Sequence, residues 1–308
     1  MLRGSLVPLV TPFRAGGLDE TALAGLIEWQ IASGSHGISV TGSTGEPAAL
    51  TLAERERVIA LAVETARGRV PVIAGTGSAN YGETLHLTRF ARRAGADAAL
   101  VVTPYYTRPG QEGLYRYFRS LAEAVDIPII LYNIPGRTAT NLEPETTARL
   151  SRDCPTIVGI KESNKDLEHV CRVMHRCGPT FAVYSGIELL CFPILALGGA
   201  GYVSATGNVL PREVARLYDL VTAGQWEEAR RLHYHLLPMN DILFIETNPV
   251  PVKAALALMG RASAEVRPPH APLRPEHEAR LREVMAGYGL LPEGRAQAPT
   301  TVPAPGAS

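Results

Sequence analysis

The chain has 308 residues, of which 46% are hydrophobic and 19% charged, and its formal net charge is zero. This length suits one large domain or two smaller ones, and the balanced charge gives no attraction to nucleic acid or to an anionic membrane surface. No apolar run reaches the length of a membrane span, and the N-terminal run, which Pro8 and Pro12 interrupt, lacks the apolar core of a signal peptide, so we expect a cytoplasmic protein.

Eight short apolar runs predict strands. They cover residues 6–11, 37–40, 70–74, 98–102, 127–132, 155–163, 181–184 and 201–204. The runs are continuously hydrophobic instead of alternating, which is typical of parallel strands that are buried on both faces.

Helices are predicted between these strands. They cover residues 19–34, 51–68, 81–94, a stretch after Gln111, 143–152, 166–176 and 189–197. Asp19 can cap the first helix, and the run from Thr51 to Glu54 has the residues of a capping box. Eight strands that alternate with helices indicate an α/β fold of the (β/α)8 TIM barrel type.

More helices are predicted after the eighth strand than a barrel needs, at about 211–222, 225–246, 249–259 and 274–287. We therefore expect a catalytic barrel in residues 1–224 and a C-terminal helical subdomain in residues 225–291. Residues 292–308 are mostly Pro, Ala, Gly and Thr, a composition that predicts a disordered tail.

A metal site is not expected. The four cysteines have no CxxC spacing and are expected to be reduced thiols. His233 and His235 are two residues apart on a predicted helix, so they do not share a face.

Lys161 is the last residue of the sixth apolar run before the chain turns polar. A lysine is costly to bury at a strand end, and desolvation favours its neutral amine, which is a nucleophile. Because the active site of a barrel lies at the C-terminal ends of its strands, Lys161 is a candidate catalytic residue. The alternative is that its side chain simply extends to solvent.

Other strand ends carry polar groups that fit the same site. The segment from Gly42 to Glu46 has glycines and two hydroxyls, which can hold a carboxylate or a phosphate or can form an ordinary turn. Tyr132 ends the fifth strand and could relay protons. Arg137 could bind a carboxylate with its planar fork or form a surface salt bridge.

Taken together, these residues place an amine, hydroxyls, phenols and a guanidinium at one barrel mouth, without a dinucleotide motif or a phosphate-binding lysine. The set suits imine chemistry on a 2-oxo acid. Lysine condenses with the ketone, the imine acts as an electron sink, and the enamine attacks an aldehyde.

The segments 42–46, 132–135 and 159–162 resemble the dihydrodipicolinate synthase / N-acetylneuraminate lyase family. The resemblance extends from about Leu6 to Leu291 and includes segments 104–106, 184–186 and 248–253. It implies a pyruvate-dependent lyase that uses no cofactor beyond a lysine imine, and a homotetramer without nucleic-acid or membrane partners.

The resemblance also implies roles for eight residues. The catalytic set is Lys161 as the Schiff-base lysine, Tyr132 as the proton-transferring phenol, and Ser43, which links Tyr132 to a second phenol, Tyr106, from a neighbouring subunit. The substrate-binding set is Thr44 for the pyruvate carboxylate, Arg137 for the carboxylate of the second substrate, and Gly186 and Val203 on the wall of the pyruvate site.

Arg137 favours the synthase branch, whose members condense pyruvate with L-aspartate 4-semialdehyde in lysine and diaminopimelate biosynthesis. Three departures from the synthase pattern leave alternatives open: Ser43 in place of threonine, Ile187 in place of an acidic residue, and the run 163–165. The first alternative is another pyruvate-dependent aldolase or dehydratase that acts on a sugar acid or a hydroxy-oxo acid. The second is a non-catalytic small-molecule sensor.

The feedback site of the synthases is matched only in part. Tyr105 and Glu83 fit it, but Leu52, Arg55 and Ala79 stand where sensitive enzymes carry other residues. The resemblance therefore predicts weak or absent inhibition by L-lysine.

Overall fold

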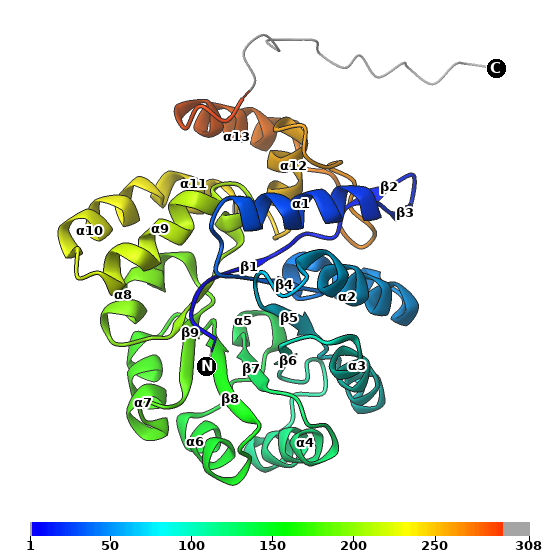
Figure 1. Ribbon diagram of the computed structural model, residues 1–308, viewed down its shortest axis with the longest axis vertical. Coiled ribbons are helices and arrows are strands. Elements are labelled where there is room, and N and C mark those ends of the chain that lie inside the picture. Colours follow the sequence, from blue (N-terminus) through cyan, green and yellow to red (C-terminus); the bar gives the residue numbers. More distant parts are fainter. Residues whose placement is uncertain (1, 292–308) are drawn as a thin grey trace.

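The computed structural model describes residues 2–291 of the chain. Eight parallel strands close into a barrel and helices surround it (Figure 1), which confirms the predicted TIM barrel. None of the helices within the described part is long and apolar enough to cross a membrane. The tail predicted to be disordered, residues 292–308, lies outside the described residues.

The barrel strands are neighbours in the order β1-β10-β9-β8-β7-β6-β5-β4, and β4 pairs with β1 to close the ring. Their bounds are β1 (Gly4–Pro8), β4 (Gly37–Val40), β5 (Val72–Gly75), β6 (Ala98–Val102), β7 (Ile129–Asn133), β8 (Ile157–Glu162), β9 (Ala182–Ser185) and β10 (Gly201–Val203). Each strand overlaps one of the predicted apolar runs, because continuous burial on both faces needs an uninterrupted apolar sequence.

The helices around the barrel are α1 (Glu20–Ala32), α2 (Leu52–Ala66), α3 (Tyr81–Ala94), α4 (Gln111–Ala124), α6 (Pro144–Asp153), α7 (Leu167–Cys177), α8 (Cys191–Ala196) and α9 (Pro211–Thr222). Both predicted start signals are confirmed. Asp19 accepts a hydrogen bond of 3.0 Å from the backbone N–H of Ala22. Thr51 and Glu54 form the complete capping box at the start of α2.

Three local elements differ from the prediction. A small hairpin, β2 (Phe13–Arg14) and β3 (Gly17–Leu18), follows β1, and a short helix, α5 (Pro135–Thr138), follows β7. The helix predicted over 225–246 is two helices, α10 (Trp226–His235) and α11 (Leu237–Ile242). Pro238 lies in the first turn of α11, where its missing N–H is tolerated, but it cannot continue α10.

The last two helices are α12 (Val250–Leu258) and α13 (Pro275–Gly287), close to the predicted ranges. They pack into one apolar cluster with parts of the barrel: Leu256 and Leu281 share this cluster with Leu26 of α1 and Tyr202 of β10. The proposed boundary between barrel and C-terminal subdomain at residue 224 stays a prediction.

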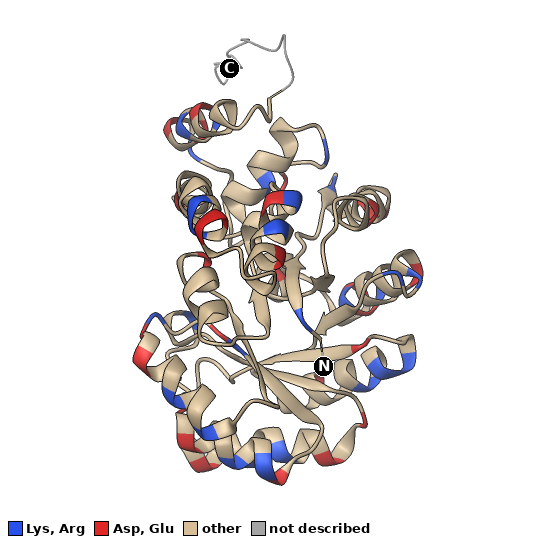
Figure 2. Ribbon diagram, turned by 60° about the vertical axis from the view of Figure 1, so that its left-hand side comes forward, with Lys and Arg blue, Asp and Glu red and all other residues tan. Residues whose placement is uncertain are grey.

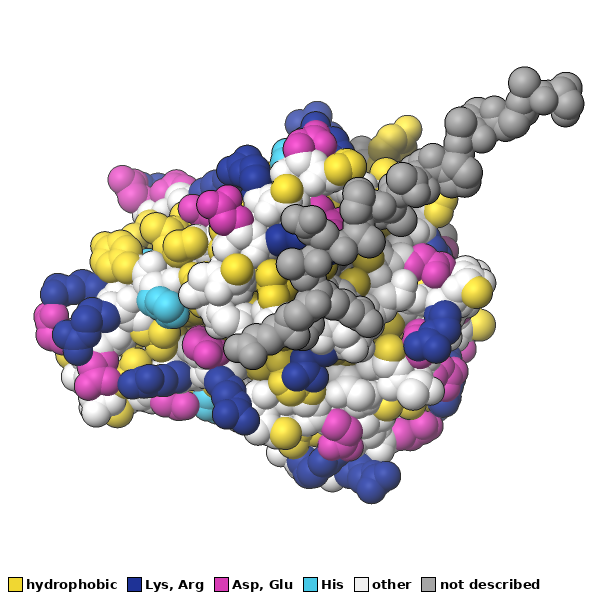
Figure 3. Space-filling view, turned by 90° about the horizontal axis from the view of Figure 1, so that it is seen from above, with side chains coloured by type: hydrophobic (Ala, Val, Ile, Leu, Met, Phe, Trp, Pro, Cys, Tyr) yellow, Lys and Arg dark blue, Asp and Glu magenta, His cyan; other side chains and the backbone are white. Residues whose placement is uncertain are grey.

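Apolar side chains fill the inside of the barrel and the layer between its strands and helices. Charged residues of both signs lie mainly on the surrounding helices, whereas the strands carry few of them (Figure 2). In the face seen in Figure 3, basic, acidic and hydrophobic side chains are interspersed. Because the active site of a barrel is built at the C-terminal ends of its strands, we look for a polar site there.

Candidate active site

A cavity of about 400 Å³ lies at the C-terminal ends of the barrel strands. Of the eight residues that the sequence predicted for the site, seven line this cavity: Ser43, Thr44, Tyr132, Arg137, Lys161, Gly186 and Val203. They converge because the carboxyl ends of all eight parallel strands meet at one end of the barrel.

Lys161 and Tyr132 form the centre of the cavity wall. They are register partners on β8 and β7, and Lys161 Nζ lies 4.2 Å from the centre of the Tyr132 ring. Their exposed fractions are only 5% and 4%. Lys161 therefore does not extend to solvent, and its amine is held against the face of an aromatic ring.

The surroundings of Tyr132 lower the pKa of its phenol. Burial by itself raises this pKa, but the charge of Lys161 and the neighbouring hydroxyls of Ser43 and Ser163 favour the phenolate more strongly. Tyr132 can thus give up and regain a proton more readily than a free tyrosine, which suits a proton-transferring residue.

Gly186 follows β9 and closes the wall beside Lys161. Its backbone N–H donates a 2.8 Å hydrogen bond to the carbonyl of Glu162. A Cβ atom at this position would lie 2.8 Å from Lys161 Cε and would overlap the hydroxyl of Ser163. Glycine is thus required here so that the lysine side chain has room beside the strand.

Thr44 and Arg137 are joined by a residue that sequence reasoning did not assign. The side-chain amide of Asn248 donates a 2.9 Å hydrogen bond to Thr44 Oγ1, and its backbone carbonyl accepts a 3.1 Å hydrogen bond from Arg137 Nη2. Asn248 also lines the cavity. The only signal for it in the sequence was its place in the family-like run 248–253.

The loop that carries Ser43 and Thr44 is fixed from behind by a buried ion pair between Glu46 and Lys253. Lys253 is completely buried, lies 3.9 Å from the centre of the Phe13 ring, and donates a 2.8 Å hydrogen bond to the carbonyl of Glu265. Burial lowers the pKa of Lys253, although the Glu46 carboxylate opposes this. The pair ties the loop to α12.

Tyr106 is the predicted site residue that does not line the cavity of its own chain. It lies between β6 and α4, is 92% exposed, and has a positive φ of 72°. Its side chain therefore lies at the surface of the chain, outside the cavity that the other seven residues line.

Three further charged residues line the cavity and were not assigned from the sequence: Lys165, Glu188 and Asp241. Glu188 accepts a 2.8 Å hydrogen bond from the backbone N–H of Ala205, and burial raises the pKa of its carboxyl group. Glu188 directly follows Ile187, the position at which the family pattern has an acidic residue. An acidic side chain is therefore present on this wall, but one position later in the sequence.

A metal-binding cluster is not present among residues 2–291: no three His, Cys, Asp or Glu side chains there are grouped to hold an ion. The four cysteines are free thiols, and Cys154 and Cys191 are buried.

Comparison with known proteins gives one consistent result. The model of the dihydrodipicolinate synthetase family matches residues 1–287. A 4-hydroxy-tetrahydrodipicolinate synthase from Thermus thermophilus is 51% identical over 294 residues, which are 95% of this chain and 98% of that protein.

Solved structures agree. The dihydrodipicolinate synthase of Aquifex aeolicus has a TM-score of 0.93 at 45% identity, covering 94% of this chain and 99% of that one. A dihydrodipicolinate synthase variant described as monomeric has a TM-score of 0.92 at 39% identity, covering 94% and 98%.

Proposed function

The chain belongs to the dihydrodipicolinate synthetase family, and from this premise we propose that it condenses pyruvate with L-aspartate 4-semialdehyde to 4-hydroxy-tetrahydrodipicolinate. This lyase reaction would serve lysine and diaminopimelate biosynthesis in the cytoplasm. The observation that carries the proposal is a buried lysine amine 4.2 Å from a buried tyrosine ring, in one cavity with Thr44 and Arg137.

The proposed reaction begins when Lys161 Nζ adds to C2 of pyruvate and water leaves, which gives a protonated imine. The imine draws electrons from C3, so C3 loses a proton and an enamine forms. The enamine carbon then attacks the aldehyde. Finally the amine of the semialdehyde attacks the imine carbon, closes the ring and releases Lys161 as a free amine, so no cofactor is consumed.

Proton transfer in these steps is assigned to Tyr132. Its lowered pKa supports this role, and Ser43 is the hydroxyl beside it. Tyr106 completes the relay only if another copy of the chain supplies it, which requires at least a dimer. We propose a homotetramer because the resemblance to the family implies it. Sedimentation of the purified protein tests this part, because in a monomer Tyr106 does not line the cavity that holds Lys161.

The two carboxylates of the substrates are assigned to two groups. Thr44 binds pyruvate, and Gly186 and Val203 line the space around it. Arg137 binds the semialdehyde, and its exposed guanidinium at the mouth suits a second substrate that arrives after pyruvate. Asn248 holds both groups in place through its two hydrogen bonds.

The enzyme assay that tests the proposal supplies pyruvate together with L-aspartate 4-semialdehyde in one arm, and a sugar acid or a hydroxy-oxo acid without added pyruvate in two other arms. We expect pyruvate to be consumed and the cyclic product to be detected by mass spectrometry in the first arm, and the acids of the other two arms to stay intact. Faster cleavage or dehydration of a sugar acid or a hydroxy-oxo acid would instead support the alternative aldolase or dehydratase, to which Ile187 and the Lys165 side chain at the cavity point.

A further inference from the structure

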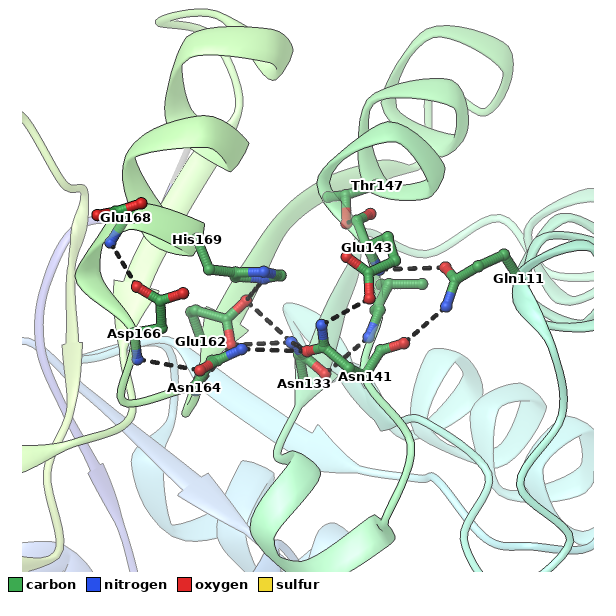
Figure 4. Close-up of polar contacts among 11 residues, drawn as sticks. Gln111, Asn133, Asn141, Glu143, Thr147, Glu162, Asn164, Asp166, Glu168 and His169 are labelled. Atoms are coloured by element: carbon green, nitrogen blue, oxygen red, sulfur yellow. Dashed lines mark hydrogen bonds and ion pairs between the residues drawn. The ribbon is translucent and has the colours of Figure 1, made fainter.

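A second polar pair lies directly behind the catalytic pair. On β8, Lys161 faces the cavity and the next residue, Glu162, faces the surrounding helices, because side chains alternate along a strand. On β7, Tyr132 and Asn133 are arranged in the same way. The register pairs Tyr132 with Lys161 and Asn133 with Glu162, so each inner residue is covalently next to a member of the outer pair. Figure 4 shows the outer pair, Asn133 and Glu162.

Glu162 is completely buried, yet each of its carboxylate oxygens has partners. Asn133 Nδ2 lies 3.0 and 3.2 Å from the two oxygens, and the backbone N–H of Asn164 donates a 2.8 Å hydrogen bond to Oε1. A further partner is His169 of α7, whose Nε2 lies 3.3 Å from Oε2 and which forms an ion pair with Glu162 when it is protonated. A buried carboxylate is tolerated only with such partners.

The outer pair is tied to its surroundings as well. Asn133 Oδ1 accepts a 3.0 Å hydrogen bond from the backbone N–H of Leu142, and Asn133 Nδ2 also donates to Asn141 Oδ1 at 2.9 Å. Asn141 in turn binds Asn164. The network thus connects the ends of β7 and β8 to the segments that begin α6 and α7 (Figure 4).

His169 is the member of this network whose ordinary pKa lies nearest to neutral pH. It is 6% exposed and lines a second cavity, of about 530 Å³, on the outer side of the barrel. The other charged groups around that cavity are Glu143, Glu145, Asp166, Arg172, His175 and Arg176. Two of the cations have acidic partners already, since Arg172 pairs with Glu168 and Arg176 with Glu145. His169 thus borders the outer cavity and does not line the active-site cavity.

We propose that Glu162 and His169 are positioning residues for the Schiff-base lysine: their ion pair fixes the end of β8 so that Lys161 Nζ stays against Tyr132. The proposal rests on the function proposed above. When His169 is neutral, buried Glu162 keeps only its hydrogen bonds to Asn133 and Asn164, and the strand end is held less firmly.

The direction of the pH effect follows from the environment of His169. Burial lowers its pKa, but the contributions of Glu162, Glu143 and Asp166 outweigh burial and leave the pKa raised. A raised histidine pKa means that the ion pair is fully present below the usual value of about 6.5 and is lost as the pH rises through the folded-state value.

The test compares rates of imine formation in the full-length wild type and in His169→Gln. Each protein is mixed with saturating pyruvate and borohydride at pH values from 6 to 10, below its melting temperature, and the modified Lys161 peptide is quantified over time. We expect the wild type to react about tenfold faster than His169→Gln at pH 6, since a small misplacement of a reacting group slows its reaction strongly. The ratio of the wild-type rate to the variant rate should approach one as the pH rises.

Two further variants sharpen the test. Glu162→Gln removes the negative charge of the ion pair. The ratio of the wild-type rate to the Glu162→Gln rate is likewise expected to be large at pH 6 and to approach one as the pH rises. His175→Gln is the matched control, because His175 lies on the same helix and lines the same cavity, whereas the histidine paired with Glu162 is His169. The ratio of the wild-type rate to the His175→Gln rate is expected to stay near one at every pH.

A ratio for His169→Gln that is near one throughout, or that is large but independent of pH, overturns the positioning role. These outcomes are distinct from failure of the proposed function, in which the wild type itself forms no adduct at Lys161.

Discussion

Two buried lysines in this chain have opposite environments. Lys253, behind the loop 42–46, pairs with Glu46 and donates to the carbonyl of Glu265. Lys161, at the barrel mouth, has no carboxylate within ion-pair distance among the described residues and lies against the Tyr132 ring beside a cavity. A buried amine with an ion-pair partner and a hydrogen-bond acceptor stabilises the fold, whereas one that faces open space can react. The third lysine of the chain, Lys165, is exposed.

The largest expected effect is on activity. Lys161→Ala removes the amine that forms the imine, so we expect kcat to fall by roughly 10³-fold or more. The melting temperature should change little, because the substitution removes an amine that has no ionic partner. Lys165→Ala is the matched control and should keep most activity. Substantial activity in Lys161→Ala would show that Lys161 is not the reactive lysine of the two.

Tyr132→Phe keeps the ring that packs against Lys161 and removes the hydroxyl. Because the proposed proton carrier is lost, we expect kcat to fall by about 10²–10⁴-fold while the protein stays folded. The lowered pKa of Tyr132 gives a second readout. The absorbance difference between wild type and variant should show a phenolate that forms below the usual tyrosine pKa of about 10; a difference that appears only above this value would contradict the assignment.

Lys253→Ala should act on stability. It leaves the buried carboxylate of Glu46 without its cation, which costs about 3–5 kcal/mol in the free energy of unfolding, and thermal melting measures the loss. The double variant Lys253→Met/Glu46→Gln removes both charges and should recover part of it. If Lys253→Ala melts like the wild type, the ion pair does not have the structural role that its burial indicates.

Arg137→Ala should weaken binding of the semialdehyde without affecting pyruvate. Loss of a charge-assisted hydrogen bond of about 1.5–3 kcal/mol should raise KM for the semialdehyde by roughly 10–100-fold. The rate at which borohydride traps the pyruvate imine should stay the same, because pyruvate is assigned to Thr44. An equal loss in both measurements would show that Arg137 contributes to the first substrate as well.

The smallest expected effect is inhibition by L-lysine. Among the residues that depart from the feedback-site pattern, Arg55 is buried and donates a 2.8 Å hydrogen bond to the carbonyl of Gly75. Burial lowers the pKa of Arg55 to about 10, and this side chain stands where sensitive enzymes carry another residue. Millimolar L-lysine should therefore change the initial rate only slightly; strong inhibition would contradict this expectation.

The barrel could be predicted from the sequence because each of its strands is a continuous apolar segment, and such a segment by itself indicates a strand buried on both faces. The same holds for the caps at Asp19 and Thr51, where a side chain bonds to the backbone a few residues away. The hairpin from Phe13 to Leu18 escaped prediction because strands of two residues carry no periodic signal.

The site residues could be predicted from their positions at the C-terminal ends of the strands, because these ends lie next to one another at one end of a barrel. What escaped are contacts between residues far apart in the chain. Asn248 meets Thr44, and Lys253 meets Glu46, through the way the C-terminal helices pack on the barrel. No local pattern encodes such pairs. The partner of Glu162, by contrast, lies only one helix turn into α7, but a single histidine on a helix is no signal by itself.

The most direct test of the account is the position of the pyruvate adduct. The wild-type protein is incubated with pyruvate and borohydride, digested, and analysed by mass spectrometry; with only three lysines, at 161, 165 and 253, the assignment is unambiguous. We predict one carboxyethyl group, on Lys161, and unmodified Lys165 and Lys253. An adduct on Lys165 instead, or none on any lysine, would contradict the claim that Lys161 is the imine-forming residue.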